Sequence, residues 1–365
     1  MKKLVQPNID NINSVIEIIR EVLESGYVAQ GEYVDKFEKE ISSYLGLNNS
    51  LVLSSGTAAL DIALRLIGIQ SGDEVISTAL TAEPTNTSIV YNSGKVVWAD
   101  VDSRNGLISP ESIEASITEK TKAIMIVHYA GMVCDMDKIN QISDKYNIPV
   151  IEDAAHALGS KYSNGKFVGN GKNITIYSFQ AIKTLTTVDG GMISLPNNML
   201  YDKAKKMRWF GLSKEVSRME NDIDIVGSKY NMNNLNAAIG LIQLETLDRN
   251  LKLYRRNGKL MDKSLSIIPH VLVDYNVDTE SNYWLYTIKV DKKAEVIDAL
   301  LKYGFSASDL HKRNDQHTVF SESKKELKNL DNFYTKMLHI PCGPWISEED
   351  VELMARIIIS IENGE

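Results

Sequence analysis

Hydrophobic positions along the chain follow two periodicities. Between residues 9 and 23 they fall three or four positions apart, which predicts an amphipathic helix that Ser25-Gly26 ends. The same spacing predicts helices over Val34–Leu45, closed by Gly46, and over Ala58–Leu66. Elsewhere the apolar residues form short runs bounded by turn residues, which is typical of strands. The chain therefore mixes helices with strands.

The apolar runs alternate with helical segments over the first two hundred residues. Strands that alternate with helices are typical of an α/β fold with a mainly parallel sheet. The run Ala123–Tyr129 is apolar on both faces, as expected where helices cover both sides of the sheet. The seven predicted strands are Ser50–Leu53, Glu74–Ser77, Val96–Asp100, Ala123–Tyr129, Val150–Asp153, Ile174–Phe179 and Met192–Leu195.

The pattern changes near residue 250. Helical spacing over Leu235–Leu247 continues to Arg255-Arg256-Asn257, where polarity rises. We therefore predict a large α/β domain over residues 1–250 and a smaller α+β domain over residues 251–365. In the second domain we expect a strand at Tyr283–Val290, a helix at Ala294–Tyr303, and a last helix opened by the capping-box sequence Ser347-Glu348-Glu349-Asp350.

Composition narrows the class of protein. The 365 residues are 43% hydrophobic and 24% charged, which is typical of a globular protein. A formal charge of −8 argues against a broad nucleic-acid surface but leaves room for a local anion site. The two cysteines, Cys134 and Cys342, are too few for a disulfide framework and lack metal-type spacing, so we expect a reducing compartment and no metal site. Without an apolar stretch of about 18 residues or a signal-peptide core, we predict a cytoplasmic protein and no membrane partner.

Polar residues that directly follow apolar strands are the first candidates for chemistry, because ligands of α/β sheets bind there. Ser55-Gly56-Thr57 follows one such strand and precedes a predicted helix. Glycine permits close approach of a ligand to the backbone, and a helix start offers N–H groups to a phosphate. A purely structural glycine turn is the commoner interpretation of this pattern taken alone.

An aspartate and a histidine follow another buried strand. Asp153 ends the strand Val150–Asp153, and His156 comes three residues later. A buried carboxylate needs a cationic partner, and the protonated ring nitrogen of a ligand would serve. The alternative is that Asp153 caps a following helix and His156 packs as an ordinary polar side chain.

Lys183 follows the strand Ile174–Phe179 within a segment that is poorly suited to a continuous helix. Lysine is the residue that forms Schiff bases with carbonyl compounds. Taken singly, a solvated lysine is the ordinary interpretation, because the chain has 40 basic residues. The motifs around Lys183 favour the Schiff-base interpretation over a solvated lysine.

These motifs resemble, in order and spacing, those of the pyridoxal-phosphate-dependent sugar aminotransferases of the DegT type, which have the aspartate aminotransferase fold (fold type I). The resemblance covers nearly the whole chain. It rests on Ser25-Gly26-Tyr27-Val28-Ala29-Gln30-Gly31, Gly56-Thr57, Glu152-Asp153-Ala154-Ala155-His156, Ser178-Phe179 with Lys183, Thr186-Thr187-Val188-Asp189-Gly190-Gly191, Arg208-Trp209-Phe210-Gly211, Tyr230-Asn231-Met232-Asn233 and Leu338-His339-Ile340-Pro341.

The resemblance implies a role for each matched residue. Lys183 would bind the aldehyde of pyridoxal 5′-phosphate and move a proton between substrate and cofactor, while Asp153 would pair with the ring nitrogen. His156, where many relatives have glutamine, would lie against the cofactor ring and its hydroxyl. The implied phosphate ligands are Gly56, Thr57 and Ser178.

The resemblance also implies a homodimer with shared active sites. A residue of the partner subunit would complete the phosphate site, with Asn231 as first choice and Lys229 as second. His311 and Arg313 would contact a substrate diphosphate or carboxylate, although a solvated polar loop explains them equally well. The remaining substrate candidates are Tyr27, Lys229 and His339.

Two positions depart from the family pattern. Ala82 stands where many relatives carry an aromatic residue that stacks on the cofactor, so it would contact the cofactor without a ring. Val188-Asp189 stands where Gly-Glu is commoner. Lys183 itself argues against the branch that carries histidine there and performs dehydration.

Together these features predict transfer of an amino group from L-glutamate to a keto-sugar nucleotide, a 4-keto- or 3-keto-6-deoxyhexose, in surface-polysaccharide or deoxyaminosugar biosynthesis. The cofactor would alternate between pyridoxal and pyridoxamine 5′-phosphate. A keto-cyclitol or small phosphorylated ketone is an alternative acceptor, and a regulatory protein that binds the cofactor without turnover is an alternative function. A nucleotide-binding oxidoreductase ranks last, because no G-x-G-x-x-G follows the first strand.

Overall fold

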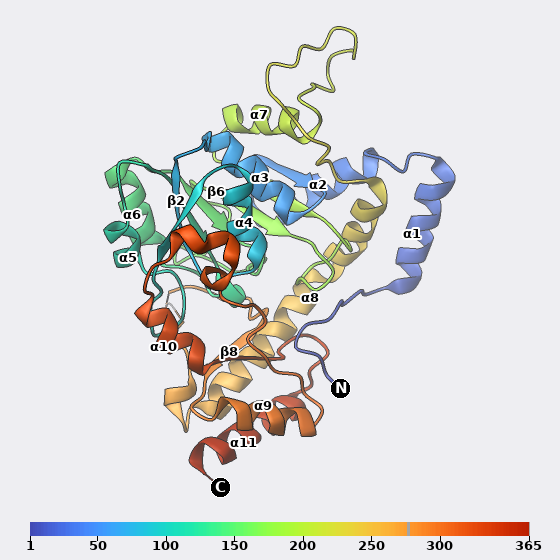
Figure 1. Ribbon diagram of the computed structural model, residues 1–365. Coiled ribbons are helices and arrows are strands. Elements are labelled where there is room, and N and C mark those ends of the chain that lie inside the picture. Colours follow the sequence, from blue (N-terminus) through green and yellow to red (C-terminus); the bar gives the residue numbers. More distant parts are fainter. Residues whose placement is uncertain (276–277, 365) are drawn as a thin grey trace.

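A seven-stranded sheet forms the centre of the computed structural model, which describes residues 1–275 and 278–364 (Figure 1). The strand order is β1-β7-β6-β5-β4-β2-β3, and β7 alone runs antiparallel to its neighbours. The strands are β1 (Ser50–Leu53), β2 (Glu74–Thr78), β3 (Lys95–Ala99), β4 (Thr121–Val127), β5 (Val150–Asp153), β6 (Ile174–Ser178) and β7 (Gly191–Ser194). The predicted mainly parallel sheet is confirmed.

Helices flank the sheet, and α8 crosses the whole molecule (Figure 1). Helix α3 packs on β6 and β7, whereas α1 and α2 pack on α8. The helices of this part are α1 (Ile12–Ser25), α2 (Glu32–Leu45), α3 (Gly56–Ile67), α4 (Glu83–Tyr91), α5 (Pro110–Ala115), α6 (Met136–Tyr146), α7 (Asn198–Arg208) and α8 (Asn234–Leu265), with a 3-10 turn η1 (Tyr129–Gly131) after β4. Among the residues described, no helix is long and apolar enough to cross a membrane.

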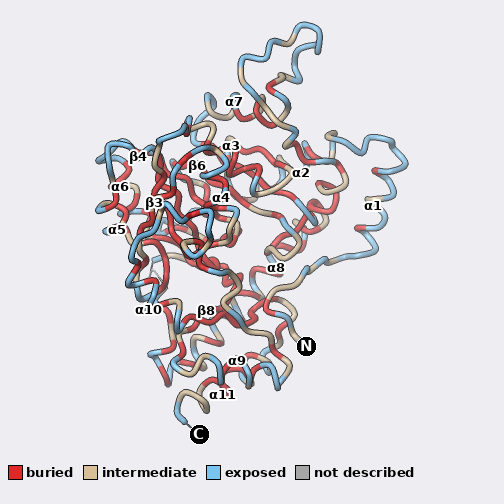
Figure 2. Tube along the Cα trace, viewed as in Figure 1, coloured by how far each residue is buried: buried red, intermediate tan, exposed pale blue. Residues whose placement is uncertain are grey.

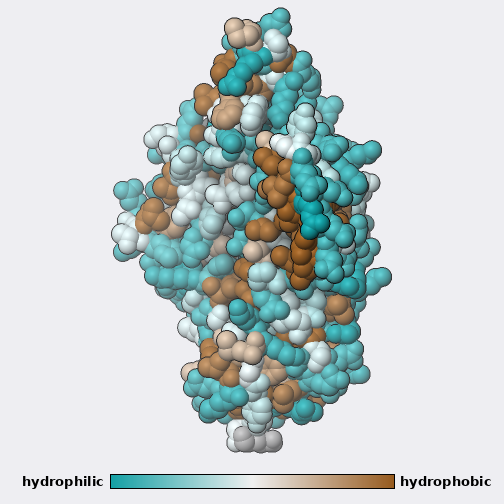
Figure 3. Space-filling model, turned by 90° about the vertical axis from the view of Figure 1, so that its right-hand side faces the viewer, coloured by the Kyte–Doolittle hydropathy of each residue, from teal (hydrophilic) through white to brown (hydrophobic). Residues whose placement is uncertain are grey.

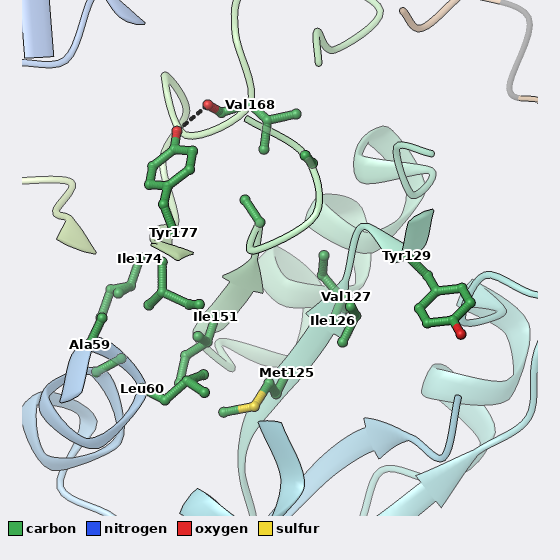
Figure 4. Close-up of a cluster of buried hydrophobic side chains, with 14 of the residues drawn as sticks. Ala59, Leu60, Met125, Ile126, Val127, Tyr129, Ile151, Val168, Ile174 and Tyr177 are labelled. Carbon is green, nitrogen blue, oxygen red and sulfur yellow. Dashed lines mark hydrogen bonds between the residues drawn. The ribbon is translucent and has the colours of Figure 1, made fainter. Parts of the chain in front are cut away.

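The central strands are buried on both faces (Figure 2). Figure 4 shows Met125 and Val127 of β4, Ile151 of β5 and Leu60 of α3 within one apolar cluster. Helices on both sides of the sheet explain why these strands are apolar at successive positions. The cluster holds the strand ends in fixed relative positions.

The C-terminal part has a small sheet of its own. Strands β8 (Tyr286–Lys289) and β9 (Met337–Ile340) pair antiparallel. Its helices are α9 (Lys293–Lys302), α10 (Lys328–Lys336) and α11 (Glu348–Asn363), with short turns η2 (Pro269–Val271), η3 (Asn314–Gln316) and η4 (Thr318–Ser323). The predicted capping box is present, since Ser347 and Asp350 each accept a backbone hydrogen bond from the other.

Two predicted boundaries fall differently in the structure. The strand expected over Tyr283–Val290 begins only at Tyr286, because Tyr283 has a left-handed backbone with φ of 56°. Residue 250 lies inside α8, which is continuous and contributes Leu251 to the main apolar cluster and Leu265 to a second one. The division into domains at residue 250 therefore stays a prediction.

Candidate active site

The candidate residues meet at one edge of the sheet. Asp153 is the last residue of β5 and Ser178 the last of β6, and β5 and β6 run parallel. Lys183 follows β6 by a short loop, and α3 begins at Gly56 beside Ser178. The carboxyl ends of parallel strands are the usual place for a ligand in such sheets.

Asp153 is a buried carboxylate held by two neutral donors. The Thr85 hydroxyl donates to Oδ2 at 2.7 Å, and the Ala155 N–H donates to Oδ1 at 3.0 Å. Burial raises the pKa of Asp153, although the two donors and the charge of Lys183 oppose that rise. No helix follows between Asp153 and β6, so the interpretation of Asp153 as a helix cap is wrong.

Lys183 directs its amine inward. Its Nζ atom lies 4.3 Å from the ring centre of Trp284. Burial lowers the pKa of Lys183 to about 8, and the charge of Asp153 opposes the fall. The interpretation of Lys183 as a solvated side chain is therefore wrong, and a useful fraction of its amine is neutral near physiological pH.

His156 is buried and uncharged in this site. Its Nδ1 atom accepts a hydrogen bond from the Ala130 N–H at 3.3 Å, which assigns the ring proton to Nε2. The ring stacks on Trp284 with centres 4.2 Å apart. Burial lowers the pKa of His156 well below its usual range. His156 is thus a neutral donor toward the site.

Gly56, Thr57 and Ser178, the predicted phosphate ligands, lie at the start of α3 and the end of β6. The Ser55 hydroxyl accepts from the Ala58 N–H, and the first N–H groups of α3 have no carbonyl partner within the helix. A Cβ atom on Gly56 would lie 3.1 Å from the Ser178 Cβ, which shows how closely these residues approach. A Cβ atom on Gly191 would lie 2.4 Å from the Ser55 carbonyl carbon, so the start of α3 requires glycine there.

The segment from His311 to Asp315 also borders this site. The His311 ring lies parallel to the His156 ring, with 5.9 Å between centres. Arg313 is buried and forms ion pairs with Asp315 and Asp331. Its charge is compensated inside the chain, which argues against the predicted contact of Arg313 with a diphosphate.

Two other predicted residues occupy supporting positions. His339 is fully buried, with its Nε2 atom 3.1 Å from the Tyr129 hydroxyl oxygen and its Nδ1 atom 3.1 Å from the Thr287 hydroxyl oxygen. It borders the site through Tyr129, whose ring lies 5.6 Å from that of His156. Ala82 is half-buried at the start of α4. Their predicted contacts with substrate and cofactor stay predictions.

Tyr27, Lys229 and Asn231 lie outside the Lys183 cluster. Asn231 forms a β-bridge with Leu53, and its Oδ1 atom is buried without a hydrogen-bond partner in the described chain. Lys229 is exposed, and Tyr27 is 77% exposed. The predicted roles of these residues stay predictions.

Sequence reasoning missed several residues of the site. Thr85, Trp284 and Tyr129 contact Asp153, Lys183 and His156 or their neighbours, yet each lies far from them in sequence. Asn314 is another, since it donates to the Thr81 carbonyl beside Ala82. No local pattern marks these residues, because their role comes from contacts between distant segments.

Glu152 points to the opposite face of β5. It accepts hydrogen bonds from His128, Tyr162 and Asn173, and it borders a separate cavity of about 440 Å³. Successive strand residues face opposite sides of a sheet, which explains this separation from Asp153. Glu152 is a structural neighbour of the Lys183 site.

Known proteins resemble this chain in sequence and fold. The family model of the DegT/DnrJ/EryC1/StrS aminotransferase family matches residues 10–359. The UDP-4-amino-4,6-dideoxy-N-acetyl-beta-L-altrosamine transaminase of Campylobacter jejuni is 30% identical, covering 97% of this chain and 96% of its own. The crystal structure of the sugar aminotransferase CalS13 from Micromonospora echinospora has a TM-score of 0.95 at 31% identity, with 100% of both chains covered.

A further solved relative bears on the cofactor. The putative sugar aminotransferase Spr1654 from Streptococcus pneumoniae has a TM-score of 0.89 at 26% identity, covers 99% of this chain, and is known in PLP and PMP forms that cover 98% and 97% of its own chain. These forms and the family imply pyridoxal phosphate as the cofactor. On the family match and this identity, the chain belongs to the DegT/DnrJ/EryC1/StrS aminotransferase family.

Proposed function

We propose that this chain transfers an amino group from L-glutamate to a nucleotide-linked 4-keto- or 3-keto-6-deoxyhexose, in the biosynthesis of a surface polysaccharide or a deoxyaminosugar. The observation that carries the proposal is the inward amine of Lys183, which has a pKa lowered to about 8 and interacts with the charge of Asp153. Such an amine can attack a carbonyl group near neutral pH.

The residues of the site fit pyridoxal 5′-phosphate. A protonated pyridine nitrogen would give buried Asp153 the cation that its two neutral donors do not supply. The Nε2–H of His156 can donate to the ring hydroxyl, and the start of α3 with Ser178 can hold the phosphate. When bound, the cofactor supplies an electron sink for the carbon that loses its proton.

The chain's own groups would then orient the reactants and move protons. Lys183 can take a proton from the substrate carbon and return it, because its pKa lies close to the working pH. Asp153 would keep the ring nitrogen protonated, and His156 would fix the orientation of the ring. Burial beside Trp284 would keep water from the reacting carbon.

The choice of acceptor rests on similar proteins. The Campylobacter jejuni relative is named for a nucleotide-linked amino sugar, and CalS13 is described as a sugar aminotransferase. We extend this substrate class to the present chain, with L-glutamate as donor and pyridoxamine 5′-phosphate as the second cofactor form. A panel of keto-sugar nucleotides, a keto-cyclitol and a phosphorylated ketone, each offered with glutamate, tests the extension. Amination of the keto-cyclitol or the phosphorylated ketone, with none of the keto-sugar nucleotides aminated, would overturn it.

The cofactor assignment has a direct test. Purified protein should absorb at about 390–430 nm, and borohydride should fix the cofactor to the peptide that carries Lys183. Lys183→Ala should abolish amino transfer, whereas Lys252→Ala, which changes an exposed lysine of α8, should not. Amino transfer by the Lys183→Ala variant would refute the proposed function.

We also propose that the protein is a homodimer with shared sites. Ile12, Ile16 and Leu23 of α1 are exposed, on the side where Figure 3 shows a stripe of apolar residues. An apolar stripe of this kind favours burial against a second copy. The Oδ1 atom of Asn231 has no hydrogen-bond partner among the described residues, which supports its contact with a group from outside the chain.

Mixing two inactive variants tests the shared site. A dimer of one Lys183→Ala chain and one Asn231→Ala chain has one site with both residues intact if each site draws Asn231 from the partner. Activity should then return to part of the native level on mixing. No recovery in a mixed dimer that has demonstrably formed would refute the sharing.

We further propose that the protein works in a reducing compartment, the cytoplasm. Cys134 and Cys342 are both free and buried, which supports this location. Localisation of a tagged chain by cell fractionation checks it, and recovery outside the cytoplasm would contradict it.

A further inference from the structure

We propose that His311 contacts the acceptor itself, and that its Nε2 atom hydrogen-bonds a hydroxyl group beside the carbon that gains the amino group. This inference rests on the proposed function and adds the chemistry of substrate recognition. It also replaces the expectation that His311 and Arg313 bind a diphosphate or carboxylate.

His311 lies at the edge of the Lys183 site. Its ring is within 5° of parallel to the His156 ring at 5.9 Å between centres, and it lies 6.5 Å from the ring of Tyr129. The charges of Lys183 and Glu83 both act on it. His311 therefore lies within electrostatic range of both the Lys183 amine and Glu83 at the start of α4.

The Nε2 atom of His311 has no partner of its own. It is buried and makes no hydrogen bond with any residue that the structure describes. Burying a polar group unpaired costs about 1–3 kcal/mol, so such atoms are rare in native proteins. A bound acceptor would supply the hydrogen-bond partner that the Nε2 atom lacks.

The backbone around His311 is held in place from several sides. Leu310 has a left-handed φ of 62°, the His311 N–H donates to the Asp309 carbonyl at 2.7 Å, and the Tyr334 hydroxyl donates to the His311 carbonyl at 3.1 Å. A non-glycine residue in this conformation persists only where its surroundings enforce it. The backbone position from which the His311 ring extends is thus held before any ligand binds.

Asn314 fixes the same segment to the loop before α4. Its N–H donates to the Ala79 carbonyl and its Nδ2 donates to the Thr81 carbonyl, both at 2.9 Å, while its Oδ1 accepts from Asn86 at 2.9 Å. Arg313 is locked in its ion pairs with Asp315 and Asp331. Arg313 and Asn314 are therefore positioning residues, and His311 is the residue of the segment whose ring lies beside that of His156.

The charge state of His311 selects the ligand. Burial, followed by the positive charge of Lys183, lowers the pKa of His311 to about 4. At neutral pH the ring is uncharged, so it offers no electrostatic attraction to a phosphate. A neutral imidazole nitrogen pairs well with a hydroxyl, which both donates and accepts hydrogen bonds.

The test separates the two half-reactions. His311→Phe keeps a ring and removes Nε2, and His270→Phe, at an exposed position, is the matched control. The donor half-reaction is followed by the loss of cofactor absorbance with glutamate, and the acceptor half-reaction by its return with the best keto-sugar nucleotide of the panel. We expect His311→Phe to lower acceptor kcat/KM by roughly 10- to 100-fold and the donor rate by less than about threefold.

An acceptor analogue that lacks the hydroxyl beside its keto carbon identifies the contact. The native protein should lose roughly the same factor with this analogue, and His311→Phe should not distinguish the two acceptors. Equal loss in both half-reactions, no loss in either, or continued discrimination by His311→Phe would each overturn the proposal. Failure of the native protein to bind cofactor or react with glutamate would instead refute the proposed function.

Discussion

Removing the ammonium group at position 183 should stabilise the cofactor-free protein. The pKa of Lys183 falls from its ordinary 10.5 to about 8 in the folded chain. Each pKa unit corresponds to about 1.4 kcal/mol, so protonated Lys183 costs the folded state up to about 3 kcal/mol relative to the unfolded state. Lys183→Met keeps the length of the side chain and removes this cost at pH 7.

The gain should depend on pH in a defined direction. The folded protein releases the Lys183 proton near pH 8, whereas the unfolded chain holds it to about 10.5. Between these values the unfolded chain binds more protons, so the stability of the native sequence rises with pH. The advantage of Lys183→Met should therefore be full below pH 8, shrink above it, and vanish above pH 10.5.

Urea unfolding of cofactor-free protein measures both effects. The native sequence, Lys183→Met and Lys252→Met are compared at pH 7, 8.5 and 10 at one protein concentration, because association would shift the midpoints. Lys252 is exposed, so its replacement should change the unfolding free energy by less than about 0.5 kcal/mol. An unchanged or lower stability of Lys183→Met at pH 7, or a gain that is equal at pH 7 and 10, would refute the reasoning.

Three further changes test the surroundings of the site. Thr85→Val removes a donor to Asp153, so the pKa of Asp153 should rise further and titration with pyridoxal phosphate should show roughly tenfold weaker binding; equal affinity would contradict this role. Val188→Gly relieves a β-branched residue at φ of 70° and should raise the unfolding free energy by about 1 kcal/mol, whereas a lower melting temperature would exclude strain there. Asn314→Ala removes one acceptor of the Asn86 amide and the donor to the Thr81 carbonyl, and should cost about 1–3 kcal/mol in urea unfolding, with no change in midpoint as the contrary result.

Local sequence patterns predicted the sheet because its central strands are buried on both faces. The run Val150–Asp153 is both a predicted and an observed strand, and its last residue lies where a ligand of a parallel sheet is expected. The glycine at position 191, in contrast, is explained by tertiary packing, because the start of α3 packs directly on it. Strand β9 was not predicted, since it is short and depends on pairing with β8.

The site could be predicted only in part. Lys183, Asp153 and His156 carry recognisable motifs, whereas Thr85 and Trp284 enter the site through folding alone. Thr85 is separated from Asp153 by 68 residues along the chain. No periodicity encodes such a contact, because it arises from the order of strands in the sheet.

Sequence by itself determined the alternation of elements, the family motifs and the type of residue available at each strand end, because these depend on neighbours within a few positions. Tertiary structure alone decided the state of those residues. It placed the Lys183 amine over the ring of Trp284, neutralised Arg313 with Asp331, and left the His311 Nε2 atom without a partner among the described residues. Burial and charge compensation depend on groups brought together from distant segments, and these two effects set the pKa and the bonding capacity of each side chain.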